Sequence, residues 1–397
     1  MNTLLPKASI GHVAANRKTG DAALRVLTAN DFAIARAEIT AWEGYAPTPL
    51  VSLTALATNI GVSEVLYKDE GPRFGLGSFK ALGGSYAALR VLQREISKRL
   101  GQEVSMADIR NGKYAVQCAT ITLVSATDGN HGRSLAWGCK RFGAPCRIYI
   151  HAEVSEGRAV AMRDLGAEVI RLYGDYDASV ALCKTEAEAN DWFVVSDTSW
   201  PGYSLPPRDV MSGYGVMTLE ICEAMTQAPT HVFLQGGVGG LAAGVVAGLR
   251  QYWGDAAPRV VIVEPDLAAC LFESAKSGVA TTVAISQETL MAGLSCGEPS
   301  EMAWEILVEE ASDFLTIPEN LVAPSVRLLA TPLEGDTAIE AGESAIAGLA
   351  ALIAARTDAT LSQKLGLDAQ SRVLLIGSEG VTDVAIFSMI MEGRDAA

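Results

Sequence analysis

Several residue types that build common functional sites are scarce or poorly spaced in this chain. Its 397 residues include only four histidines and seven cysteines, and no two cysteines form a Cys-x-x-Cys pair. Structural zinc sites take their ligands from closely spaced cysteine and histidine pairs. We therefore expect no zinc site and no bound metal ion.

Positive charge and long apolar runs are also scarce. The 31 Lys and Arg residues are outnumbered by 46 Asp and Glu residues, which gives a net charge of −15. Such an acidic chain repels nucleic acid and anionic membrane surfaces, so neither is expected as a partner. The longest apolar run, at 345–355, is too short to cross a bilayer, and residues 1–20 lack the apolar centre of a signal peptide. We predict a cytoplasmic protein.

In that compartment the cysteines are expected to be mostly reduced. Cys270 and Cys296 form the one pair that merits attention, and the simpler expectation is two unrelated buried thiols.

Hydrophobic residues make up 49% of the chain, which is typical of a globular protein with a large core. Apolar runs that read as strands alternate with stretches of helical periodicity, as in α/β proteins with mainly parallel sheets. The expected strands are 114–126, 146–151, 167–172, 192–197, 231–235, 259–265 and 372–377. The expected helices include 80–100, 155–166, 175–190 and 241–252.

Three glycine-marked junctions, at 125–132, 235–241 and 377–383, follow expected strands. Open parallel sheets bind ligands at such strand ends. The junction "QGGVGGL" (235–241) is open to three interpretations. Its amides at a helix start suit a phosphate group. Alternatively, Gly237, Gly239 and Ala242 fit the dinucleotide pattern GxGxxA, with Glu264 as the ribose-binding acid, which would indicate an NAD(P)-dependent oxidoreductase. The third possibility is a tight strand–helix turn without function.

The stretch "GPRFGLGSFKALGGSYA" (71–87) places Lys80 at the start of an amphipathic helix. A lysine there opposes the helix dipole, which favours the neutral, nucleophilic amine, although most lysines are merely solvated. The second junction, "SATDGNHG", holds Thr127, Asp128, Asn130 and His131 within five residues. Its amides and hydroxyl suit a substrate carboxylate, whereas a simple helix cap would account for only part of the cluster.

A nucleophilic lysine, a phosphate cup and a carboxylate-binding loop together indicate pyridoxal 5'-phosphate, which forms a Schiff base with lysine. Nicotinamide chemistry needs no such lysine.

The motifs also resemble a known family. "YKDEGPRFGLGSFKALGGSYA" (67–87) is similar to the lysine motif of the tryptophan-synthase-β type (fold type II) of pyridoxal-phosphate enzymes, and in particular of the diaminopropionate ammonia-lyase family. The stretches 126–143, 196–203, 291–299 and 377–383 resemble further motifs of that family, in the same order. Gly71, Gly77, Ser78, Gly377 and Ser378 depart from the family pattern beside the cofactor, which leaves the exact substrate open.

The resemblance implies a fold and a set of roles. It implies two interleaved domains of mainly parallel, twisted sheets flanked by helices: residues 1–111 plus 209–397 as a large cofactor-binding domain and 112–208 as a small domain carrying the asparagine loop. A homodimer is expected. Lys80 would hold the cofactor and remove the α-proton, and Thr127, Asp128 and His131 would bind the substrate. The remaining cofactor-binding residues would be Phe79, Asn130, Gly236, Gly237, Val238, Gly239, Gly240 and Ser378.

Asp128 and Asp197 suggest which substrate is used. A diaminopropionate carries a second ammonium at its β-carbon, and carboxylates can pair with that cation. Elimination of ammonia would then give pyruvate and a second ammonia. A serine, threonine or hydroxyaspartate dehydratase, or a β-replacement enzyme of the same fold, remains an alternative, and Asp197 could instead be a helix or turn cap.

Overall fold

The computed structural model describes residues 4–15, 20–127, 129–174 and 176–394. Its contacts divide the chain into two compact units. The large unit comprises Met1–Ala29, Pro47–Ser78 and Met217–Ala397, and the small unit comprises Asn30–Ala46 and Phe79–Val216. The division falls within helix α10 (Leu205–Ala224).

A seven-stranded sheet forms the centre of the large unit, in the order β1-β10-β9-β8-β11-β3-β2. The five central strands are parallel, and the two edge strands, β1 and β2, run antiparallel to their neighbours. Every residue of β8 and β10 is buried, as expected for apolar strands covered on both faces. The strands are β1 (Gly11–Ala14), β2 (Leu50–Ser52), β3 (Glu64–Asp69), β8 (His231–Gln235), β9 (Arg259–Pro265), β10 (Asp313–Ile317) and β11 (Arg372–Gly377).

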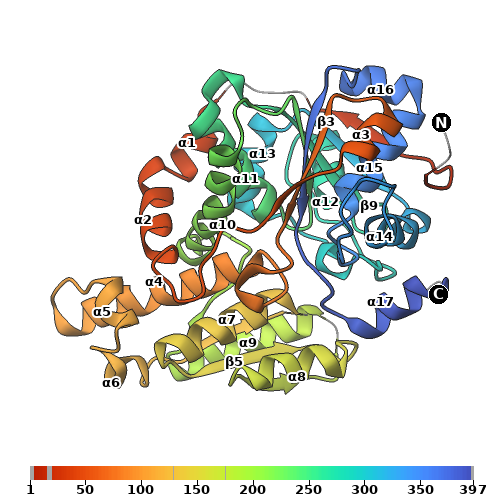
Figure 1. The fold of residues 1–397 in the computed structure, drawn as a ribbon. Helices are drawn as coiled ribbons and strands as arrows, with labels where there is room; N and C mark the ends of the chain where they lie inside the picture. Colours follow the sequence, from red (N-terminus) through yellow and green to blue (C-terminus); the bar gives the residue numbers. More distant parts are fainter. Residues whose placement is uncertain (1–3, 16–19, 128, 175, 395–397) are drawn as a thin grey trace. The chain divides into compact units, whose positions relative to one another are not determined.

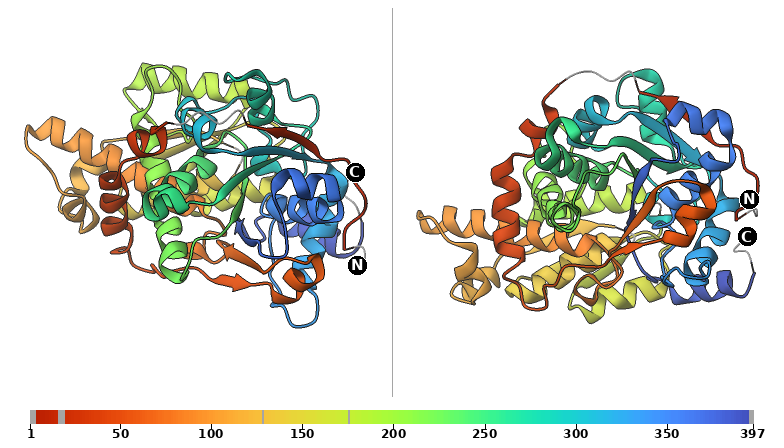
Figure 2. Two further views of the ribbon diagram at one scale, coloured as in Figure 1. Left: turned by 90° about the horizontal axis from the view of Figure 1, so that it is seen from above. Right: turned by 45° about the horizontal axis from the view of Figure 1, so that its top comes forward.

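Helix α15 lies against β8, β9 and β10, where its apolar sequence forms part of the main core of the large unit. The first and last described segments of the chain lie on the same side of this unit in both views of Figure 2. The helices of the unit are α1 (Ala22–Val26), α3 (Thr54–Ile60), α11 (Gly240–Trp253), α12 (Cys270–Ser277), α13 (Glu301–Glu310), α14 (Val322–Ala330), α15 (Ala347–Thr357), α16 (Ala359–Leu365) and α17 (Val384–Met391).

The small unit contains a four-stranded parallel sheet in the order β6-β5-β4-β7. Helices α7 and α9 pack against β4 and β5, as Figure 1 shows in its lower part. The strands are β4 (Leu123–Ala126), β5 (Cys146–Ile150), β6 (Glu168–Arg171) and β7 (Phe193–Val194). The helices are α2 (Ala29–Ile39), α4 (Lys80–Leu100), α5 (Met106–Arg110), α6 (Ala115–Cys118), α7 (Asn130–Phe142), α8 (Glu156–Asp164) and α9 (Tyr176–Asn190).

Helices α4 and α7 approach each other closely because small residues line their contact. A Cβ added at Gly84 would lie 2.8 Å from Ser134 Oγ, and one added at Gly138 would lie 2.7 Å from Ser85 Cα. The Ser85 hydroxyl donates to Ser134 O at 2.7 Å, which locks the two helices in register. This contact fixes the start of α4, where Lys80 lies, relative to the start of α7.

The predicted α/β class and mainly parallel sheets are confirmed. One predicted strand is wrong over most of its length, because 114–126 forms a strand only at Leu123–Ala126. Within 114–122 the apolar residues do not share one environment, because Cys118 and Ile121 are fully buried whereas Val116 is 79% exposed. The amides of Cys118 and Ala119 bond instead to the carbonyls of Tyr114 and Ala115, in and just after α6.

The contacts draw the unit boundaries elsewhere than the expected domains, since they group 79–111 and 30–46 with the small unit. The assignment of 1–111 plus 209–397 to cofactor binding, and of 112–208 to the asparagine loop, stays a prediction.

A buried ion network in the large unit holds the segment that precedes the lysine. The Arg73 guanidinium bonds Glu70 Oε1 at 2.7 Å and Glu220 Oε1 at 2.7 Å, while Lys68 Nζ bonds Glu220 Oε2 at 2.6 Å. Burial alone would lower the pKa of Arg73, but the two carboxylates raise it. Phe74, directly after Arg73, has a φ of 50°, which is strained for a phenylalanine and is held by this setting.

We predict that Arg73→Met strongly destabilises the protein, because the buried carboxylates of Glu70 and Glu220 would lose the guanidinium that pairs with both. Removing one partner of a buried ion pair costs about 3–5 kcal/mol. Arg25→Gln is the control, since Arg25 pairs with Glu305 on the surface. Urea unfolding should show a much lower midpoint for Arg73→Met and no measurable change for Arg25→Gln. Equal midpoints would contradict a structural role for the network.

Candidate active site

Lys80 is the first residue of α4 in the small unit. Its Nζ contacts Asp197 Oδ2 and lies 5.4 Å from the centre of the Phe79 ring. About a fifth of each charged side chain remains exposed, 21% for Lys80 and 19% for Asp197. The structure therefore brings together two of the predicted catalytic residues, whose separation in sequence is large.

His131, near the start of α7, is the third member of this cluster. Its Nε2 donates to the carbonyl of Val195 at 2.8 Å, which leaves Nδ1 facing Asp197 Oδ2 at 3.9 Å. Burial lowers the pKa of His131, although the Asp197 charge raises it. Burial would raise the pKa of Asp197, but the charge of Lys80, together with that of His131 at the low pH where the imidazole is protonated, holds it well below its usual range. At neutral pH the cluster thus contains an ionised Asp197 and a neutral His131.

The loop that carries Asp197 is closed by Tyr203. The Tyr203 hydroxyl accepts from the Ser196 amide and donates to the Val194 carbonyl, both at 2.9 Å. The Trp200 ring stacks on Tyr203, with ring centres 4.0 Å apart. Asp197 does not cap a helix here, because the residues after it form a turn and a short bridge. Its carboxylate is directed at Lys80 instead.

The asparagine loop follows β4. Asn130 begins α7, and the Thr127 hydroxyl accepts from the Gly129 amide at 3.4 Å. Asp128 lies outside the described residues. The structure thus places Thr127 before the loop and Asn130 after it, next to His131 in the chain.

The glycine cup, Gly236 to Gly240, lies in the large unit between β8 and the N-terminus of α11. Gly237 and Gly239 have φ angles of 61° and 95°, which glycine adopts without strain. A Cβ at Gly236 would lie 2.4 Å from Glu264 Cγ, and one at Gly239 would lie 3.0 Å from Ala303 Cβ. The backbone therefore requires glycine at these positions, and the start of a 14-residue helix makes the cup suitable for an anion.

Glu264 is not available as a ribose-binding acid. It is fully buried, and its two carboxylate oxygens accept from the amides of Leu271 at 3.0 Å and Phe272 at 2.7 Å. Burial raises the pKa of Glu264 to about 8. The carboxylate caps α12 and packs under the cup, which removes the main support for the dinucleotide interpretation.

Two further predicted positions lie in the large unit. Ser378 follows β11 and is 4% exposed. Cys270 and Cys296 both adjoin Gly237: the Cys270 thiol donates to Gly237 O at 3.5 Å, and a Cβ at Gly237 would lie 3.6 Å from Cys296 Sγ. Sequence distance concealed that both cysteines adjoin the cup.

The sequence interpretation missed Tyr214, whose ring packs against Phe79 with centres 4.7 Å apart. The signal was present in the paired glycines of "LGGSYA". A Cβ at Gly83 would lie 2.4 Å from Tyr214 Cε1. A glycine inside a helix often marks such a close approach.

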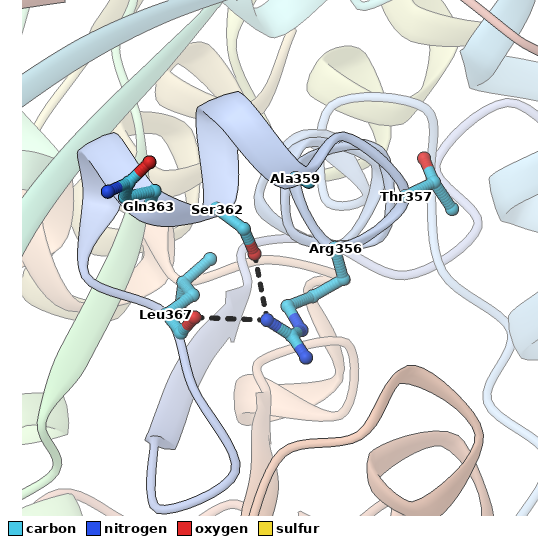
Figure 3. A pocket seen from close by; sticks show the side chains of 6 residues that line it. All are labelled: Arg356, Thr357, Ala359, Ser362, Gln363 and Leu367. Atoms are coloured by element: carbon cyan, nitrogen blue, oxygen red, sulfur yellow. Dashed lines mark hydrogen bonds between the residues drawn. The ribbon is translucent and has the colours of Figure 1, made fainter.

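An open hollow elsewhere in the large unit lies beside α15 and α16 (Figure 3). Its prominent charge, Arg356, bonds Ser362 Oγ at 2.8 Å and Leu367 O at 3.0 Å, and also the carbonyls that end α3. We assign it a structural role. Within the described ranges no group of three or more potential metal ligands occurs, and none of the helices described is long and apolar enough to cross a membrane.

Comparisons with known families, sequences and structures all identify pyridoxal-phosphate enzymes as similar to this chain. Residues 41–379 match the family described as pyridoxal-phosphate dependent enzyme. The chain is 38% identical over 360 residues to diaminopropionate ammonia-lyase of Escherichia coli strain K12, covering 89% of each chain. It superposes on a crystal structure of the Escherichia coli enzyme in complex with D-serine with a TM-score of 0.89, 34% identity and 99% coverage of both chains. A second crystal structure of that enzyme, with an aminoacrylate-PLP azomethine reaction intermediate, gives a TM-score of 0.87 at 34% identity, covering 98% of this chain and 99% of the other.

Proposed function

The chain belongs to the family of pyridoxal-phosphate-dependent enzymes, and we propose that it is an ammonia-lyase that converts 2,3-diaminopropionate and water to pyruvate and two molecules of ammonia. The similarity to diaminopropionate ammonia-lyase, over 89% of both chains, supports this substrate. The single structural observation that carries the proposal is the contact of the Lys80 amine with an ionised Asp197.

The residues present fit pyridoxal phosphate. The small unit presents the Lys80 amine beside an aromatic ring, and the large unit presents a glycine cup in which added Cβ atoms would clash. Lys80 would hold the cofactor covalently, with Phe79 against its ring and Asn130 bonding its hydroxyl. Ser378 would face the ring nitrogen. The phosphate would be held by the backbone of Gly236, Gly237, Val238, Gly239 and Gly240.

When bound, the cofactor supplies an aldehyde for an amine and a ring that accepts the electron pair left by a lost α-proton. This chain's residues then manage the protons and charges. Lys80 Nζ takes the α-proton, and Thr127, Asp128 and His131 bind and orient the substrate. A serine hydroxyl at the ring nitrogen enforces no protonation there, so we expect elimination, in which the leaving group removes the electron pair at once.

Asp197 is suited to pairing with the β-ammonium rather than to donating a proton, because its pKa lies below the usual range. The leaving nitrogen already carries its protons. When the Cβ–N bond breaks, the electron pair moves to nitrogen and neutral ammonia departs. A hydroxyl leaving group would require a proton from the site, so an ionised Asp197 favours the diamino substrate over serine.

The first prediction concerns the covalent attachment. Reduction of the holoenzyme with borohydride, followed by peptide mapping, should place the cofactor adduct on Lys80. Lys68 is the internal comparison, because it is buried and already paired with Glu220. An adduct on Lys68 or Lys140, or none, would refute the assignment.

The second prediction tests the substrate. Wild type should release pyruvate from diaminopropionate in preference to serine. Asp128→Asn and Asp197→Asn should lower kcat/KM for diaminopropionate far more than for serine, because only the diamino substrate carries a β-ammonium. An uncompensated buried charge costs about 3–5 kcal/mol, which corresponds to a hundredfold or more in rate.

Preference of the wild type for serine, or an equal fall on both substrates in both variants, would favour the dehydratase alternative. Tight binding of NAD to the native protein would favour the oxidoreductase alternative.

The assembly and location complete the proposal. A homodimer is supported by α17, an apolar helix in which Val384 is 69% and Met391 37% exposed, a surface that a second copy could cover. Sedimentation equilibrium should give twice the chain mass of 41.7 kDa, and a monomer mass would contradict it. Cytoplasmic location is supported by the free thiols of the seven cysteines, and cell fractionation tests it.

A further inference from the structure

Tyr214, in α10, carries a buried hydroxyl that the roles above do not use. The residue is 1% exposed, and its Oη makes no hydrogen bond to any residue that the structure describes. A buried hydroxyl without a partner is unfavourable, so its retention calls for an explanation.

The packing around Tyr214 holds its ring in one place. A Cβ at Gly83 would lie 2.4 Å from Tyr214 Cε1 and 2.8 Å from Cζ, so the glycine makes room for the phenol on the face of α4 that also carries Lys80. One helix turn separates Gly83 from Lys80. On its other side the Tyr214 ring lies against Phe79, tilted by 58°. The hydroxyl is therefore fixed next to the lysine.

Electrostatics point to the same neighbours. Burial raises the pKa of Tyr214, the positive charge of Lys80 opposes that rise, and the negative charge of Asp197 adds to it. The Lys80 amine lies close enough to the Tyr214 hydroxyl to lower that pKa also as a hydrogen-bond partner, although the two groups do not meet full hydrogen-bond geometry.

We propose that Tyr214 is a positioning residue that accepts a hydrogen bond from the Lys80 amine when Asp197 releases it. This inference rests on the proposed function, in which Asp197 turns to the β-ammonium of the substrate. At that point Lys80 loses its carboxylate partner, and the phenol oxygen beside it is ready to accept an N–H. Lys80, once the substrate amine has displaced it from its bond to the cofactor, would be a neutral amine, and the bond to Tyr214 would hold it in place with its lone pair available for the α-proton. Only hydrogen bonds change partners, and no proton moves to or from Tyr214.

The test uses Tyr214→Phe, which removes the hydroxyl and keeps the ring. Thr218→Val is the matched control, because Thr218 lies one turn further along α10 and also has a buried hydroxyl without a partner. Its contact is with Gly248, where an added Cβ would lie 2.7 Å from Thr218 Cγ2. Thermal midpoints of both variants should equal or exceed that of the wild type, since each removes an unsatisfied group.

The kinetic readouts distinguish positioning from packing. For the holoenzyme on diaminopropionate, Tyr214→Phe should lower kcat about tenfold with KM unchanged, as expected for the loss of one hydrogen bond. On serine, which has no β-ammonium to draw Asp197 away, kcat should fall much less. Lys80 must also leave Asp197 to form its bond to pyridoxal phosphate, so after removal of the cofactor the rate at which absorbance returns on adding it should likewise fall about tenfold. Thr218→Val should match the wild type in kcat, in KM and in the rate of cofactor recapture.

Wild-type kcat for Tyr214→Phe on diaminopropionate would overturn the inference, as would an equal fall on both substrates. The proposed function fails separately, if the wild type releases no pyruvate from diaminopropionate. In that case the rate of cofactor recapture still decides whether Tyr214 holds Lys80: a rate equal to that of Thr218→Val overturns the inference, and a slower rate supports it.

Discussion

The arrangement of the small unit depends on the contact between the Lys80 ammonium and the Asp197 carboxylate. Both groups are about four-fifths buried, and a buried charge is costly unless it is paired. Asp197 remains ionised at neutral pH because the positive charge of Lys80 opposes the effect of burial. The helix start, the loop after β7 and the start of α7 must therefore all deliver their side chains to one point.

Close packing of the helix backbones, rather than surface loops, positions the start of α4. The α4–α7 contact depends on Gly84, Ser85 and Gly138, and a Cβ at Gly213 of α10 would lie 2.3 Å from Leu82 O in α4. Small residues thus fix two helices against α4 near the residue that carries the amine. The loop bearing Asp197 has its own anchor in the Tyr203 hydroxyl, which bonds the backbone on both sides of Val195. Rigid elements hold catalytic groups more accurately than mobile ones.

The sequence pattern predicts secondary structure correctly where the features that define an element are local to it. The predicted helix 80–100 matches α4, because its amphipathic period and Gly101 as a left-handed C-cap are local features. Edge strands β1 and β2 are three or four residues long and carry too few residues to show a period. β3 reads as polar because Lys68 pairs with a carboxylate 152 residues away. Tyr214 was likewise hidden, since its role depends on a helix crossing; Asp128 remains a prediction from its motif.

The neutral state of His131 has a consequence for substrate choice. A protonated imidazole 3.9 Å from Asp197 would satisfy that carboxylate and repel a second cation. Burial, helped by the positive charge of Lys80, lowers the pKa of His131 and prevents this. The bond from Nε2 to the Val195 carbonyl further fixes the tautomer that has no proton on the side facing Asp197. The negative charge of Asp197 thus faces one cation, Lys80, whose side chain can donate instead to the oxygen of Tyr214 once it is a neutral amine. A carboxylate arranged in this way can accept an incoming ammonium without the site losing its charge balance, whereas an uncharged hydroxyl would gain nothing from it.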